Sequence, residues 1–96
     1  MSRPVYSAES RSDLLKISEY IARDNPTAAR RFVDQLEQKC DNLALSPEMG
    51  FPCDELSTGL LCWPVGNYVV FYRSLGDGIE IARILHGARD IPRAFK

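Results

Sequence analysis

The segment that decides the fold is YVVFYRSLGDGIEIARILHGARDI, residues 68–91. Residues 68–74 and 79–85 are rich in β-branched and aromatic side chains, which favour strands. Between them, residues 75–78 (LGDG) have the composition of a tight turn, because glycine adopts positive φ at no steric cost. The segment therefore predicts a β-hairpin.

A compact polar group follows the second strand of this hairpin. It contains the single histidine of the chain, His86, together with Arg89 and Asp90. His86 could act as a general acid or base, because a histidine titrates near neutral pH. It could equally cap the end of the sheet or hydrogen-bond Asp90. Arg89 and Asp90 could contact a partner protein, or they could pair within the chain.

Upstream of the hairpin, residues 60–65 read as a strand, and Pro64 within it indicates a sheet edge or a bulge because proline lacks a backbone donor. Residues 49–58 read as a loop. The strand 68–74 is apolar on both faces, which predicts a central strand covered on both sides. The helical hairpin can cover one face of this strand. Nothing else in the sequence is an evident cover for the other face, which suggests that a partner covers it.

The first half of the chain predicts a short strand at residues 5–6 and two helices. Ser7 can cap the first helix, and Asn25 followed by Pro26 can end it and start the second, which Ser46-Pro47 stops. Apolar side chains recur at helical spacing, and the ones expected in the core are Leu14, Ile17, Phe32 and Leu36. We therefore predict a single domain over residues 1–96 with an α+β fold. Its N-terminal short strand and antiparallel helical hairpin pack on an antiparallel β-sheet.

Composition narrows the possible functions. The chain has 96 residues, a hydrophobic fraction of 45% and a net charge of −1, so it does not attract nucleic acid by overall charge. A local basic end lies within residues 81–96. We expect no signal peptide or membrane span. Cys40, Cys53 and Cys62 match no metal or redox spacing, so free thiols in the cytoplasm and no metal or cofactor are expected.

The order of elements resembles the ParE branch of the ParE/RelE toxins of bacterial toxin–antitoxin modules. The resemblance covers nearly the whole chain. It is carried by the segments Leu14…Ile17…Tyr20-Ile21, Pro26…Ala29, Leu43…Ser46-Pro47-Glu48-Met49-Gly50, Gly66-Asn67-Tyr68-Val69-Val70-Phe71-Tyr72-Arg73 and Ile84-Leu85-His86-Gly87-Ala88-Arg89-Asp90.

This resemblance implies a plasmid-stabilisation type of toxin that binds and inhibits DNA gyrase without chemistry of its own. It also implies a ParD-like antitoxin that neutralises the toxin in a hetero-oligomer and provides the only contact with operator DNA. We therefore expect no catalytic residues. The candidate partner-binding residues are Trp63, Arg73, Arg83, His86, Arg89, Asp90 and Arg93.

Two alternatives remain open. RelE-like toxins cut mRNA on the ribosome, which requires cations at the phosphate and a titrating group for the 2′-hydroxyl. In many of them an arginine follows the aromatic residue of the glycine–aromatic strand, whereas Val69 follows Tyr68 here, and Phe95 offers no acid after the last strand. Arg73, Arg83, His86 and Arg89 could still rebuild such a site. The second alternative is an inactive relative that only assembles with its antitoxin and regulates its operon.

Overall fold

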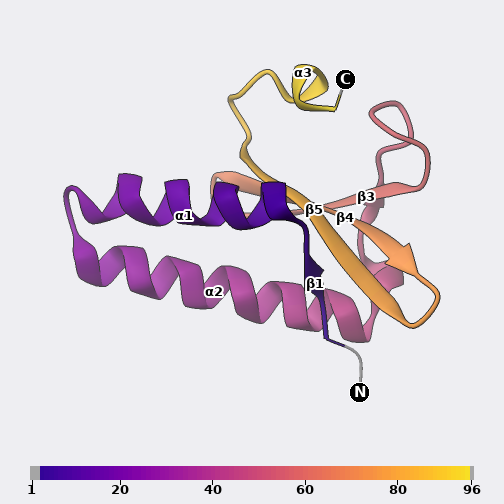
Figure 1. Cartoon of the computed structure of the whole chain (residues 1–96), viewed down its shortest axis with the longest axis horizontal. Coiled ribbons are helices and arrows are strands. Elements are labelled where there is room, and N and C mark those ends of the chain that lie inside the picture. Colours follow the sequence, from indigo (N-terminus) through magenta and orange to yellow (C-terminus); the bar gives the residue numbers. More distant parts are fainter. Residues whose placement is uncertain (1–2, 96) are drawn as a thin grey trace.

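A computed structural model describes residues 3–95 of the chain. Within these residues, a hairpin of two long helices covers one face of a five-stranded sheet, and a short C-terminal helix lies on the other side (Figure 1). The predicted α+β fold is confirmed. In chain order the elements are β1 (Val5–Tyr6), α1 (Ala8–Ala22), α2 (Pro26–Leu45), η1 (Pro47–Met49), β2 (Phe51–Pro52), β3 (Leu60–Val65), β4 (Tyr68–Leu75), β5 (Gly78–His86) and α3 (Ile91–Ala94).

The predicted hairpin forms the centre of the sheet, whose strand order is β1-β5-β4-β3-β2. Leu75 pairs with Gly78, so the turn consists of Gly76 and Asp77 alone. The prediction that glycines of this turn adopt positive φ was wrong. Neither Gly76 nor Gly78 does so, whereas Gly66 in the β3–β4 turn has a φ of 59°. The sheet is antiparallel except at β1, which runs parallel to β5.

Residues 49–58, expected to be a loop, contain more structure than predicted. Met49 ends the 3₁₀ turn η1, and β2 then pairs antiparallel with β3. Two residues are too short to show strand periodicity, so the pattern could not reveal β2. Because β2 covers only Leu61 and Cys62, the outer edge of β3 is open at Pro64. The predicted sheet edge at this proline is confirmed.

Both long helices begin at the predicted caps. The Ser7 hydroxyl accepts a hydrogen bond from the Ser10 N–H, and the Asn25 side chain accepts one from the Ala28 N–H. These acceptors satisfy backbone donors that the first helical turn leaves without intrahelical partners. α2 ends at Leu45, next to Ser46-Pro47 as predicted.

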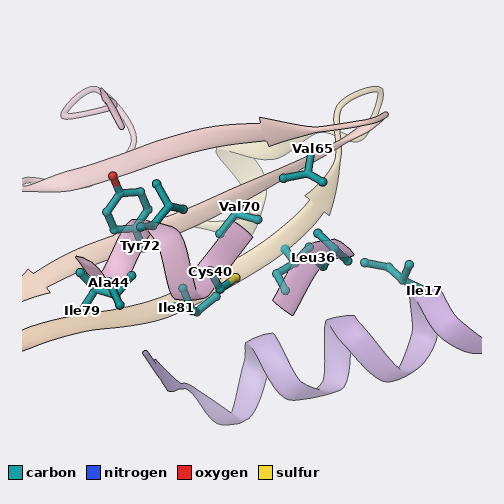
Figure 2. Packing of buried hydrophobic residues seen from close by; sticks show 11 residues of the cluster. Ile17, Leu36, Cys40, Ala44, Val65, Val70, Tyr72, Ile79 and Ile81 are labelled. Atoms are coloured by element: carbon teal, nitrogen blue, oxygen red, sulfur yellow. The ribbon is translucent and has the colours of Figure 1, made fainter. Parts of the chain in front are cut away.

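The main core lies between the helical hairpin and one face of the sheet (Figure 2). Ile17 and Leu36 are buried there, whereas Leu14 and Phe32 are only half-buried at its margin. The Tyr72 side chain is fully buried, and its hydroxyl donates a hydrogen bond of 2.7 Å to the Pro47 carbonyl. This bond ties the end of the helical hairpin to the central strand.

The second face of the sheet is covered by the chain itself, so the expected partner is not needed for this purpose. Phe71 points to this face and packs edge-on against Phe95, with ring centroids 5.0 Å apart. Ile91 and Ala94 of α3 and Leu56 of the β2–β3 loop complete this second cluster. Sequence reasoning took the C-terminal residues for a basic tail and missed that their apolar members cover the sheet. None of the helices described is long and apolar enough to cross a membrane.

Candidate functional site

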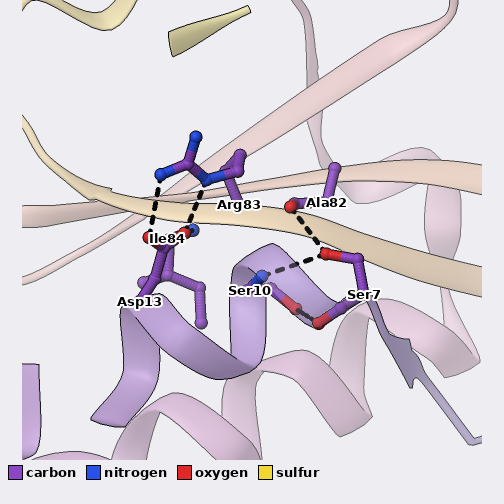
Figure 3. Close-up of polar contacts among 6 residues, drawn as sticks. All are labelled: Ser7, Ser10, Asp13, Ala82, Arg83 and Ile84. Atoms are coloured by element: carbon purple, nitrogen blue, oxygen red, sulfur yellow. Dashed lines mark hydrogen bonds and ion pairs between the residues drawn. The ribbon is translucent and has the colours of Figure 1, made fainter. Parts of the chain in front are cut away.

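A buried carboxylate joins α1 to the edge of β5. The side chain of Asp13, which is 7% exposed, accepts hydrogen bonds from Arg83 Nε at 2.8 Å and Arg83 Nη2 at 2.9 Å (Figure 3). It also accepts the Ile84 N–H at 3.0 Å. The bonds to Asp13 raise the pKa of Arg83 above its usual range. Arg83, a predicted partner-binding residue, is therefore engaged in an internal ion pair.

Two serines extend this junction along the same strand edge. The Ser7 hydroxyl donates to the Ala82 carbonyl at 2.8 Å, and the Ser7 N–H donates to the Ile81 carbonyl at 3.0 Å (Figure 3). The fully buried Ser10 hydroxyl donates to the Ser7 carbonyl at 2.9 Å. β1 pairs with β5 only at Glu80 and Ile81, so the first turns of α1 supply the next hydrogen bonds of that edge.

A register shift in β5 explains how Arg83 reaches this edge. Phe71 lies opposite Arg83 while the next residue, Tyr72, lies opposite Ile81, which leaves Ala82 as an extra residue. Such a β-bulge interrupts the alternation of side chains and bends the strand. The shift also allows Ile81 and Ile84 to face the same core although they are three residues apart.

Arg73 and Arg83 line one small hollow of about 280 Å³ on the second face of the sheet. Arg73 is held there by a short hydrogen bond from its guanidinium to the Ser57 hydroxyl. Glu9 and Glu80 line the same hollow, so its two cations face two carboxylates. The hollow is consequently a poor site for a phosphate group.

His86 lies at the exposed end of β5 and has structural contacts on two sides. Its Nδ1 accepts the Ala88 N–H at 3.0 Å, and its ring packs edge-on against Tyr68 with centroids 5.1 Å apart. His86 therefore contacts the turn after β5 through the Ala88 N–H.

An open cleft lies beside His86, and we call it the Tyr20 cleft. It consists of two adjoining hollows of about 690 and 270 Å³ that share Tyr20, Tyr68 and His86. Tyr20 projects from α1 with 65% of its surface exposed. Phe32 lines the larger hollow and packs on Tyr68 at 5.4 Å. Burial, with a smaller contribution from Tyr20, raises the pKa of Tyr68, so its hydroxyl stays neutral.

Two cations line the smaller hollow of the Tyr20 cleft. Lys16 comes from α1 and Arg89 from the segment after β5, and both are exposed. The Asp13 carboxylate also lines this hollow, but Arg83 already neutralises it. The cleft thus combines aromatic surface with net positive charge, a combination typical of protein-binding hot spots.

The remaining predicted residues do not join this cleft. Trp63 is half-buried in β3 and stacks on Phe51, which is 56% exposed, with centroids 5.7 Å apart and an interplanar angle of 10°. Asp90 and Arg93 are exposed around the start of α3. The candidates therefore fall into separate places, with only His86 and Arg89 together in the Tyr20 cleft.

Sequence reasoning missed Lys16 and Tyr20 as members of this site. Tyr20 lies one turn from Ile17, which suggests a core position, and only its exposure shows otherwise. A large aromatic side chain next to charged residues on a helix was the one available signal. Among the residues described, no group of three or more histidine, cysteine, aspartate or glutamate side chains could hold a metal ion.

The fold and the site define a small α+β protein with an exposed aromatic and basic cleft. The family described as "ParE toxin of type II toxin-antitoxin system, parDE" matches residues 5–91, and the chain belongs to it. It is 33% identical to Toxin ParE1 of Mycobacterium tuberculosis over 66 residues, which span 68% of this chain and 67% of that protein. It is 30% identical to Toxin RelE1 of Caulobacter vibrioides over 83 residues, 84% of this chain and 88% of that one.

A solved structure confirms the fold. The structure described as the chromosomal ParDE TA system from P. aeruginosa matches with a TM-score of 0.75 at 19% identity. The match covers 90% of this chain and 96% of the other. The family match over residues 5–91 confirms the resemblance to the ParE branch.

Proposed function

We propose that this protein inhibits DNA gyrase by binding to it, and that a ParD-like antitoxin neutralises it in the bacterial cytoplasm. Membership of the ParE family supports this proposal. The observation that carries it is that the four candidate groups are divided between two hollows, with Arg73 and Arg83 in one and His86 and Arg89 in the other. Arg73 is bonded to Ser57, Arg83 is paired with Asp13, and His86 lies elsewhere and holds a turn. Bond cleavage needs such groups converging on one point.

The Tyr20 cleft is the surface that we assign to the target. Tyr20 is exposed, and Lys16 and Arg89 have no ion pair with any residue among 3–95. Tyrosine and arginine are enriched among the residues that dominate protein interfaces. An acidic segment with an apolar side chain fits the cleft, because the larger hollow is aromatic and the smaller one is basic.

A supercoiling assay with purified gyrase tests the proposal. The wild-type protein should inhibit supercoiling or trap cleaved DNA, and Tyr20→Ala and Arg89→Ala should each weaken inhibition by about tenfold to thirtyfold. Leu15→Ala is a matched control, because Leu15 is 61% exposed on the same helix but outside the cleft. Intact supercoiling at saturating wild-type protein would refute the target, and equal losses in Leu15→Ala would refute the surface.

Cleavage of mRNA is a second candidate, which the relative named Toxin RelE1 favours. A translation reaction with full-length mRNA distinguishes it, since a gyrase inhibitor leaves the message intact. Codon-specific cuts that disappear in His86→Gln would support an endonuclease. Overexpression without the antitoxin that leaves growth unchanged would instead favour an inactive relative.

The antitoxin proposal has its own test. Co-expression with the product of a short neighbouring gene should give a stable hetero-oligomer and restore growth. In a gel mobility-shift assay, the complex should slow the migration of operator DNA. The toxin alone should not, because the chain has a net charge of −1. Retardation by the isolated toxin would contradict the assignment of DNA binding to the antitoxin.

A further inference from the structure

Two of the three cysteines lie side by side on the second face of the sheet. Cys53 directly follows β2, Cys62 lies in β3, and their Sγ atoms are 2.9 Å apart. A disulfide bond is about 2.05 Å long, so the sulfurs need less than about 1 Å of further approach to bond. Both are free thiols in the structure.

Backbone hydrogen bonds hold the two cysteines in this arrangement. The Cys53 N–H donates to the Leu60 carbonyl at 2.8 Å, and Cys62 pairs with Phe51. The Cys53 carbonyl accepts the Leu56 N–H at 3.0 Å, which shapes the loop between the strands. The backbone positions of the two cysteines are therefore set by the β2–β3 ladder.

The pair differs from the third cysteine in access. Cys62 is half-buried, and Cys53 is 8% exposed beneath a loop whose residues Asp54 and Glu55 are exposed. Cys40 is 0% exposed and belongs to the core on the opposite face. A small reagent can reach the pair from the loop side while Cys40 stays protected.

We propose that Cys53 and Cys62 form a reversible intramolecular disulfide by exchange with a small disulfide of the glutathione class. The Cys62 sulfur, once deprotonated, attacks one sulfur of the oxidant, which forms a mixed disulfide and releases one thiolate. The Cys53 sulfur then attacks Cys62 and releases the second. Two protein thiols are oxidised, the oxidant is reduced to two thiols, and these take up the two protons.

The bond would fasten the β2–β3 loop over the second face of the sheet. This loop carries Ser57, which holds Arg73, and Leu56, which packs in the second cluster. Burial, together with the contact to Cys53 and the charge of Glu55, raises the pKa of Cys62 to about 12. The exchange is therefore slow at neutral pH and accelerates as the pH rises, because the thiolate is the attacking species.

Incubation of the full chain with oxidised glutathione, followed by intact mass and alkylation under denaturing conditions, tests the proposal. The oxidised protein should lose the mass of two hydrogen atoms and retain one alkylatable thiol of the three. Peptide mapping should find Cys53 joined to Cys62. The thermal midpoint should rise by about 10 °C and return when dithiothreitol is added.

Single variants make the result specific. Cys40→Ala should still form the cross-link, whereas Cys53→Ser should not. Stable glutathione adducts without a cross-link, a bond that includes Cys40, or three thiols still free after oxidation at pH 9 would each overturn the proposal. An oxidised protein with an unchanged thermal midpoint would overturn the fastening of the loop. None of these outcomes depends on whether the protein inhibits gyrase.

Discussion

Replacement of Asp13 by alanine should destabilise the protein more than any surface substitution, because this buried carboxylate connects α1 to the central part of β5 through three hydrogen bonds. Its two oxygens accept three hydrogen bonds, two from Arg83 and one from the Ile84 N–H. Alanine removes all three acceptor contacts at once. The Ile84 N–H is then left without its partner in a buried position.

The size of the effect follows from these contacts. A buried N–H without an acceptor costs about 1–3 kcal/mol, and a hydrogen bond to a charged group contributes about 1.5–3 kcal/mol. The Arg83 side chain is 19% exposed and can turn toward water, so the loss of its hydrogen bonds contributes a value near the lower limit of this range. The expected loss is about 3 kcal/mol, which corresponds to about 15 °C in thermal midpoint for a domain of this size.

Urea denaturation followed by circular dichroism measures this loss, with Glu19→Ala as the control. Glu19 is an exposed carboxylate on the same helix, and its removal should change stability by less than about 0.5 kcal/mol. A double-mutant cycle with Arg83→Met should give a coupling of about 1–2 kcal/mol. A loss below about 1 kcal/mol for Asp13→Ala, or no coupling to Arg83, would refute the structural role of the junction.

Two further predictions concern the main core. Burial raises the pKa of the Cys40 thiol to about 11 from an ordinary value near 9, so the folded state holds this proton more tightly than the unfolded state. The contribution of this thiol to the free energy of unfolding should be fully present below about pH 9 and fall by about 2 kcal/mol as the pH rises to 11. In Cys40→Ala, the free energy of unfolding should decline less across the same pH range. Gly50→Ala should cost about 2–3 kcal/mol in urea denaturation, because its methyl group would overlap the buried Tyr72 hydroxyl. Gly76→Ala, which meets open space, should be nearly neutral, and Tyr72→Phe in the Gly50→Ala background should recover part of the loss. Equal costs for the two glycine variants, or the same pH profile with and without Cys40, would contradict these readings.

Local features of this protein could be predicted from the sequence because their causes span only a few residues. Ser7 and Asn25 each cap a helix through a bond to a backbone N–H three residues on. The β4–β5 hairpin follows from two β-favouring runs and a short turn between them, and it occurs as predicted. Pro64 marks an open edge because its missing donor acts at a single position.

The contacts that define the candidate site depend on the tertiary structure. Asp13 and Arg83 are 70 residues apart, and they meet because α1 packs along the edge of β5 where a bulge shifts the register. Tyr20 joins His86 in one cleft for the same reason, although 20 and 86 share no local pattern. Such pairs depend on which faces of two elements pack against each other. The spacing rules of a helix or strand describe only one element, so they do not predict these pairs. The sequence determined the elements, their caps and the hairpin, while only packing decided which charges are paired and which remain exposed to a partner.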